Sequence, residues 1–149
     1  MAILGIGVDL VHIPRIAAAL SRHPSRFPAR ILSPSELADW CQLASATASE
    51  RVRFLAVRWA VKEAAYKALS AAYRPVWHEL SYAHGLAGRP MLRYEPGRDS
   101  RASAPRLKAL HTSVSHDGEY AIANVLAEGA PSIDVAHPRR RLNACRRSV

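Results

Sequence analysis

The sequence is poor in cysteine and contains no long apolar run. Cys41 and Cys145 are its only cysteines, and their separation suits neither a disulfide framework nor a metal clip. No apolar stretch approaches the roughly 20 residues of a membrane-spanning helix. The first residues also lack the basic segment of a secretory signal and the arginine-rich pattern of a transit peptide. We therefore expect a reduced, soluble, cytoplasmic protein with no membrane partner.

Acidic residues are scarce compared with basic ones. The chain has 21 lysines and arginines against 12 acidic residues, for a formal net charge of +9. No acidic residue follows Asp134, although this last segment contains several arginines. A basic surface of this kind suits an anionic ligand or an acidic partner as readily as nucleic acid.

The length of 149 residues permits one domain of ordinary size and leaves little room for a second. We expect residues 1–130 to form that domain. Residues 131–149 contain proline, histidine and arginine but little apolar surface to bury. We therefore expect them to form a basic tail that is disordered or bound to a partner.

The first part of the chain combines a strand signal with two helix-start signals. Residues 3–11 predict an apolar, β-rich strand, and a helix is expected from about Pro14. Ser33, Pro34 and Glu36 combine a capping serine, a proline at the first helical position and a glutamate three residues after the cap. This combination indicates that the next helix begins there.

The rest of the domain predicts one long helix and several short strands. The helix is expected over residues 48–72, which are rich in alanine and contain no glycine or proline. Short strands are expected at residues 79–84, 91–94, 107–115 and 120–126. Asp117 and Gly118 lie between the last two strands and are a strong hairpin signal. We therefore expect an α+β fold, with an antiparallel sheet packed against one long helix plus shorter helices.

The segment Gly-Ile-Gly-Val-Asp at residues 5–9 is the first candidate site. It is not a dinucleotide-binding fingerprint, because Leu10 takes the place of the third glycine and both glycines lie inside the strand. Asp9 ends an apolar strand, where an aspartate is often only the N-cap of the next helix. A carboxylate there is equally a hard oxygen ligand that suits Mg²⁺. The segment alone leaves both interpretations open.

The expected long helix contains a band of charged and aromatic side chains. At about 100° per residue, one face is expected to hold Arg58, Trp59, Lys62, Glu63, Tyr66 and Lys67. Glu63 and Lys67 are compatible with an exposed ion pair worth about 0.2–0.5 kcal/mol. However, the many apolar residues of this helix indicate burial, and buried charges need partners or a ligand. We therefore favour a functional role for the band.

The third candidate segment, residues 111–117, lies in a strand that leads into the hairpin turn. Alternation places His111, Ser113 and Ser115 on one face, while His116 stands at the turn. A single histidine beside a turn and serines on a strand are commonly structural. No Gly-x-Ser-x-Gly elbow accompanies them, so a serine hydrolase has little support.

Taken together, these segments resemble the holo-(acyl-carrier-protein) synthase family of 4′-phosphopantetheinyl transferases. The family pattern has a strand G-I-G-x-D, a helix with aromatic-A-x-K-E-A-x-x-K-A, and a later S-x-S-H segment. The matching residues are 5–9, 59–68 and 113–116, in the same order and spacing, and residues 88–90 resemble the family's G-K-P turn. Residues 74–81 look closer to the eukaryotic, fungal-type branch, which makes the mitochondrial matrix the alternative compartment.

The resemblance implies a Mg²⁺-dependent transferase of fatty acid biosynthesis and lipid metabolism. Such an enzyme moves the 4′-phosphopantetheine arm of coenzyme A to a serine of an apo-acyl carrier protein and releases adenosine 3′,5′-bisphosphate. Asp9 and Glu63 would hold Mg²⁺, and Lys67 would face the same phosphates, so these three residues would be catalytic. Phosphoryl transfer depends mainly on positioning and charge neutralisation, which two carboxylates, a metal and a lysine can provide.

The resemblance also implies binding residues and an assembly. Coenzyme A would be contacted by Arg58, Lys62, Ser113, Ser115 and His116. An acidic carrier protein would dock on Arg15, Arg22 and Arg26, where electrostatic steering provides the physical rationale. The family further implies a homotrimer whose active sites lie at subunit interfaces, with the S-x-S-H segment supplied by the neighbouring chain.

Two other functions stay open on the sequence. The charge and the arginine-rich tail are compatible with a nonenzymatic nucleic-acid-binding module, which the ordered motifs make the less favoured reading. A catalytically silent carrier-binding subunit is the other, although neither metal position departs from the family pattern. The sequence leaves open which carrier is modified, which acyl-coenzyme A variants are tolerated and which group accepts the serine proton.

Overall fold

The computed structural model describes residues 2–69, 73–97 and 107–130. These ranges include all the motifs identified in the sequence. The basic tail expected from residue 131, the end of the expected long helix at 70–72 and most of the arginine-rich loop before residue 107 lie outside the described residues.

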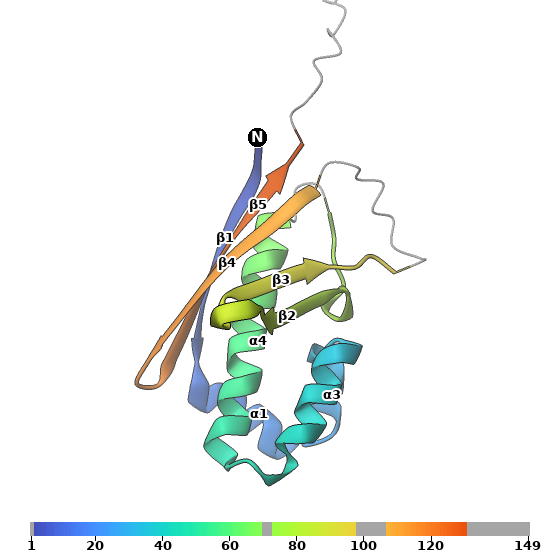
Figure 1. The fold of residues 1–149 in the computed structure, drawn as a ribbon. Helices are drawn as coiled ribbons and strands as arrows, with labels where there is room; N and C mark the ends of the chain where they lie inside the picture. The colour runs from blue at the N-terminus through green and yellow to red at the C-terminus, as the bar shows by residue number, and fades with distance from the viewer. Residues whose placement is uncertain (1, 70–72, 98–106, 131–149) are drawn as a thin grey trace, which may run out of the picture.

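A three-stranded antiparallel sheet forms one layer of the fold (Figure 1). Its strands are β1 (Ala2–His12), β5 (Tyr120–Gly129) and β4 (Leu107–Asp117), with β5 between the other two. A tight turn joins β4 to β5, and its Gly118 has a φ of 52°, which glycine adopts without strain. The hairpin predicted from Asp117 and Gly118 is therefore confirmed.

The remaining strands form a second, two-stranded antiparallel sheet. It consists of β2 (Leu80–His84) and β3 (Pro90–Tyr94). β3 lies beside β4 but does not pair with it, and Pro90 at the start of β3 has no backbone N–H to donate. The described strands therefore pair in two sheets instead of the single sheet expected, while the α+β class and the antiparallel pairing are confirmed.

The long helix α4 (Ala48–Leu69) packs across β1 and β5 (Figure 1). Gly5 and Gly7 explain how closely it approaches β1. A Cβ atom on Gly5 would overlap the carbonyl oxygen of Ala68, and one on Gly7 would overlap that of Ala64. Glycine normally weakens a strand, but here it permits contact between the two backbones. The Gly-x-Gly pattern therefore holds β1 against α4 immediately before Asp9.

Three shorter helices follow β1 and lie beside the N-terminal part of α4 (Figure 1). They are α1 (Ile13–Arg22), α2 (Arg26–Ile31) and α3 (Pro34–Gln42). The predicted capping box begins α3, because the backbone N–H of Glu36 donates to the Ser33 hydroxyl at 3.4 Å and the N–H of Ser33 donates to the Glu36 carboxylate at 2.8 Å. Short 3₁₀ turns lie at Leu43–Ser45, Trp77–Glu79 and Leu86–Gly88. None of the described helices is long and apolar enough to cross a membrane.

The two faces of the three-stranded sheet differ in their surroundings. The face toward α4 is buried, and its small residues Ala121, Ala123 and Ala127 are fully inaccessible. The opposite, outer face presents large apolar side chains that none of the described elements covers. Ile6 and Leu10 of β1 are 67% and 60% exposed there.

Candidate functional site

Asp9 and Lys67 meet where β1 crosses α4. The Lys67 ammonium donates to Asp9 Oδ1 at 2.8 Å and to the Val8 carbonyl oxygen at 2.7 Å. The side chain of Asp9 is 16% exposed and that of Lys67 is 48% exposed, so the ion pair opens to the surface. The fold thus brings together the strand motif and the helix motif, whose contacting residues are 58 positions apart.

Glu63 lies one helical turn before Lys67 and belongs to the same group. Partial burial and the neighbouring Asp9 carboxylate raise the pKa of Glu63, while Lys67 acts in the opposite direction. Two carboxylates therefore repel each other beside a single lysine, an arrangement that favours an added cation. We call Asp9, Glu63 and Lys67 the carboxylate cluster.

A cavity of about 450 Å³ opens beside the carboxylate cluster. Asp9 and Glu63 contribute to its wall, and α1 contributes Arg15 and Arg22. Arg26 is exposed at the start of α2 and is not one of the residues that line this cavity. Two of the three arginines expected to dock a carrier protein therefore face the same space as the carboxylates.

The donor set of the carboxylate cluster suits a particular kind of metal site. The described residues contain no group of three histidine, cysteine, aspartate or glutamate side chains that could hold a metal ion. Asp9 and Glu63 provide hard oxygen donors at the edge of an open cavity. Mg²⁺ is commonly held by one or two protein carboxylates together with waters and substrate phosphates. The residues present therefore fit Mg²⁺ completed by a phosphate ligand.

A second cavity, of about 490 Å³, lies on another face of α4. Arg53, Arg58, His84 and His116 line it, and we call it the basic cavity, although Glu50 also contributes to its wall. Arg58 and Glu63 are separated by about 140° around the helix axis. The band of charged and aromatic residues expected on one face of the helix is therefore divided, because different elements surround α4 on its different sides.

Comparison with known proteins gives the family. A model of the 4′-phosphopantetheinyl transferase superfamily matches residues 5–125. The holo-[acyl-carrier-protein] synthase of Edwardsiella ictaluri is 40% identical over 131 residues, which cover 87% of this chain and 100% of that relative. The chain belongs to the holo-[acyl-carrier-protein] synthases.

Solved structures of other synthases share the fold. The synthase from Neisseria meningitidis aligns with a TM-score of 0.73 and 29% identity, over 85% of this chain and 99% of the other. The Chronobacterium ammoniagenes ACPS–CoA complex aligns with a TM-score of 0.68 and 33% identity, over 88% and 100% of the two chains. The α+β fold expected from the sequence is thus the fold of the family.

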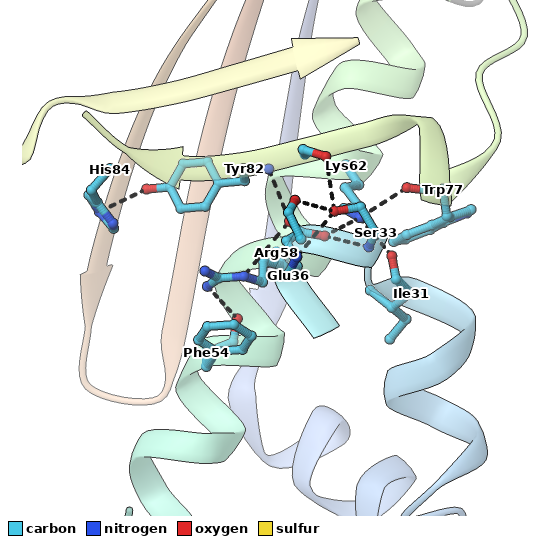
Figure 2. A network of polar contacts seen from close by, with 11 residues as sticks. Ile31, Ser33, Glu36, Phe54, Arg58, Lys62, Trp77, Tyr82 and His84 are labelled. Atoms are coloured by element: carbon cyan, nitrogen blue, oxygen red, sulfur yellow. Dashed lines mark hydrogen bonds and ion pairs between the residues drawn. The ribbon is translucent and has the colours of Figure 1, made fainter. Parts of the chain in front are cut away.

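Lys62 of the synthase is an interior residue (Figure 2). Its ammonium donates to Glu36 Oε2 at 2.6 Å and to the carbonyl oxygens of Ile31 and Trp77 at 2.7 and 2.9 Å. Burial lowers the pKa of Lys62, and the Glu36 carboxylate opposes that shift. The ammonium has three donors, and protein acceptors already occupy them. This geometry gives Lys62 a structural role and offers no support for the expected contact with coenzyme A.

Ser113 and Ser115 of the synthase lie on the outer face of the three-stranded sheet. Ser113 pairs with Asn124, which pairs in turn with Val8, and Ser115 pairs with Ile122. Both serines are exposed, and neither lines the basic cavity or the cavity beside the carboxylate cluster. Within one chain, His116 and Arg58 line the same cavity, and neither serine is part of that lining.

Some residues of the two cavities were not identified from the sequence. His84 comes from β2, far along the chain from Arg58, so no motif spacing could connect them. Phe27 and Trp59 form an apolar side of the cavity beside the carboxylate cluster, with ring centroids 5.9 Å apart. Trp59 belonged to the recognised helix motif, whereas Phe27 had no distinguishing signal. Glu36 was recognised only as a helix cap, and its partners lie on other elements.

Proposed function

We propose that this synthase transfers the 4′-phosphopantetheine arm of coenzyme A to a serine of an apo-acyl carrier protein. The serine oxygen bonds to the phosphorus that bears the arm, the serine proton passes to a base, and the bond from that phosphorus to the nucleotide breaks, releasing adenosine 3′,5′-bisphosphate. Family membership supports the reaction, and the coenzyme A complex of the Chronobacterium ammoniagenes relative supports the donor. The observation that most supports it is the meeting of Asp9, Glu63 and Lys67 beside an open cavity.

We propose that Asp9 and Glu63 hold Mg²⁺ when coenzyme A is bound. A divalent cation would supply charge neutralisation at the pyrophosphate. Its binding would offset the repulsion between the two carboxylates that contributes to the raised pKa of Glu63. Lys67 is anchored on the Val8 carbonyl oxygen as well as on Asp9, so it can keep one protein contact while it faces a phosphate.

We propose that the carrier protein docks over α1 and α2. Arg15 and Arg22 line the cavity beside the carboxylate cluster, and Arg26 is exposed nearby in sequence. These cations would steer an acidic carrier toward the cavity and orient it there. Phe27 and Trp59 give the same cavity an apolar side for the pantetheine arm.

We propose that the enzyme is a homotrimer whose neighbouring chains complete each active site. The carboxylate cluster and the basic cavity lie on different faces of α4, so each chain supports two separate parts of a coenzyme A site. The outer sheet face exposes Ile6, Val8 and Leu10 at 67%, 48% and 60%, and an apolar face of this kind favours protein contact. Ser113 and Ser115 share that face, and a second copy seated there would bring them to its neighbour.

The reaction is tested by intact-mass measurement of the carrier. Incubating the protein with coenzyme A, Mg²⁺ and an apo-carrier protein should add one phosphopantetheine, and removing Mg²⁺ with a chelator should stop the reaction. Asp9→Ala and Glu63→Ala should each lower the rate by about a hundredfold or more while leaving the circular dichroism spectrum unchanged. If several apo-carrier proteins gain no mass, the proposed reaction is wrong.

Sharing of the site between chains is tested by mixing two impaired variants. Glu63→Ala removes a carboxylate from one half of the site, and Arg58→Gln removes the guanidinium from the other. If each site takes its halves from two chains, mixed trimers contain some sites with both halves intact, and activity returns on mixing. A mixture as inactive as its components, despite subunit exchange shown by native mass spectrometry, would contradict the shared site.

A further inference from the structure

Glu36 is the centre of a buried polar network (Figure 2). Its side chain comes from α3, is 1% exposed and contacts residues of α4 and β2. Oε2 accepts hydrogen bonds from Lys62 Nζ at 2.6 Å and from the Ser33 N–H at 2.8 Å. Oε1 accepts from the Tyr82 N–H at 3.0 Å. One carboxylate thus connects two helices and a strand.

Capping of α3 does not account for this burial. Glu50 and Glu79 likewise accept from the backbone N–H three residues earlier, that of Thr47 at 2.8 Å and that of Val76 at 2.9 Å, and neither glutamate is buried. A carboxylate taken out of water is costly unless it is paired with a cation and fully hydrogen-bonded. Glu36 therefore does more than cap α3, because its carboxylate also accepts from Lys62 and from the Tyr82 N–H.

Lys62 and Arg58 lie on different sides of Glu36 and use different oxygens. Lys62 pairs closely with Oε2 and is saturated by protein acceptors. The Arg58 Nε is 3.8 Å from Oε1, which is too long for a hydrogen bond, and this buried atom has no partner in the described part of the chain. Lys62 thus neutralises Glu36 directly, whereas Arg58 is attracted by it at a distance.

The Arg58 guanidinium lies over the Phe54 ring and within reach of the Tyr82 ring. Its Cζ lies 3.2 Å from the centroid of the Phe54 ring and 5.6 Å from that of Tyr82, and Nη1 donates to the Phe54 carbonyl oxygen at 3.3 Å. Burial lowers the pKa of Arg58 to about 10, against the opposing effect of Glu36, so the group is still a cation at neutral pH. Arg58 is thus a largely buried cation in the wall of the basic cavity, which favours a bound anion there. Its unpartnered Nε–H is inaccessible to solvent and lies on the side of Glu36.

We infer that Glu36 is a positioning residue that holds the Arg58 guanidinium against Phe54, where it binds a phosphate of coenzyme A in the basic cavity. The inference rests on the proposed function and adds to it a residue that touches no substrate. Glu36 acts through Arg58, and Lys62 acts by keeping the Glu36 carboxylate paired. The helix-start motif at residues 33–36 is thereby connected to substrate binding.

The test measures KM for coenzyme A and kcat in two variants of the full chain. Glu36→Gln combined with Lys62→Met removes both buried charges together, so that neither is left unpaired. Glu36→Asp retains the charge but shortens the side chain by one methylene. We expect KM to rise about tenfold in the double variant and about threefold in Glu36→Asp, as for loss or weakening of one charge-assisted contact. We expect kcat to change by less than about twofold, because the carboxylate cluster is untouched.

Two further variants identify how Glu36 acts. Glu79→Gln is the matched control, because Glu79 also accepts two backbone N–H bonds, from Val76 and Gly97, at a site away from Arg58. It should leave KM unchanged. In an Arg58→Gln background, Glu36→Asp should raise KM no further, since the guanidinium that it positions is gone.

The outcomes separate this inference from the proposed function. If calorimetry shows that the wild-type protein binds no coenzyme A, both are overturned. If the wild type binds it but the folded variants keep the wild-type KM, or if Glu36→Asp has the same effect with and without Arg58, only the role of Glu36 is overturned. Should the variants fail to fold, the NMR resonance of the Arg58 Nε–H in the wild type decides. It should shift on saturation with coenzyme A, and an unchanged resonance overturns the inference.

Discussion

Gly7→Ala tests whether the close packing of β1 on α4 positions Asp9 in the carboxylate cluster. An added Cβ would overlap the carbonyl oxygen of Ala64 and would lie 2.8 Å from the backbone nitrogen of Ala68 and 3.0 Å from the carbonyl carbon of Ala64. All of these are backbone atoms of α4, so no side chain can rotate away to make room. β1 must therefore move off the helix, and Asp9, two residues later, must move with it.

The expected magnitude follows from two opposing effects. Replacing glycine by alanine in an unobstructed strand would stabilise the fold by about 0.5–1 kcal/mol. Overpacking a tight contact costs about 1–3 kcal/mol, and more when the backbone has to shift. We expect a net loss of about 2 kcal/mol, which in a chain of this size lowers Tm by about 4–8 °C. Because a displacement of about 1 Å at a reacting group can cost about a hundredfold in rate, we expect a comparable loss of transfer.

The assay combines thermal unfolding at fixed protein concentration with the rate of carrier modification well below Tm. Gly97→Ala is the matched control, because among the described residues an added Cβ there meets only Glu79 Oε1, at 3.3 Å. Its Tm should lie within about 2 °C of the wild type. A Gly7→Ala protein with wild-type Tm would refute the packing argument. A lowered Tm with an unchanged rate would refute only the link to Asp9.

Three further predictions concern the charges, the sheet face and the tail. Glu63→Gln should abolish transfer yet stabilise the fold. Burial and Asp9 raise the pKa of Glu63, so the wild type loses stability as the pH rises from the ordinary glutamate pKa through the raised one. The gain in Tm should therefore be larger at about pH 7.5 than at about pH 4, and an equal gain at both would contradict this prediction. Ile6→Glu should give folded monomers without transfer activity, since Ile6 is 67% exposed in one chain, and sedimentation that still reports a trimer would count against the proposed interface. Removing residues 131–149 should leave transfer unchanged and weaken any salt-dependent nucleic-acid binding, whereas affinity that survives in residues 1–130 would favour the nucleic-acid-binding alternative.

The local signals predicted most of the elements. The apolar run at residues 3–11, the capping box at Ser33 and Glu36, and the Asp-Gly turn each depend on neighbours within a few positions, and each is confirmed. The division into two sheets could not be read in the same way, because it depends on how β3 meets β4 across the fold. Residue periodicity describes one element at a time and does not predict which strands pair with each other.

The candidate site was predictable in its members but only partly in its arrangement. The family pattern placed Asp9, Glu63 and Lys67 together, and the fold confirms that Asp9 and Lys67 are in contact. The pattern also made Lys62 a coenzyme A contact, whereas its ammonium points into the interior toward Glu36. A buried lysine must have a partner, but sequence spacing cannot say whether that partner is a ligand or a carboxylate 26 positions away.

The position of α4 explains why its charged residues serve different purposes. A helix at the edge of a fold has one solvent-exposed face and one buried face, so its polar residues share one environment. α4 instead has a sheet on one side, α1 and α2 on another, and the basic cavity on a third. Arg58, Lys62 and Glu63 lie within six residues of one another and therefore reach three separate surroundings. Because Arg58 and Glu63 line different cavities, mixing the two impaired variants tests whether a second chain completes the proposed coenzyme A site.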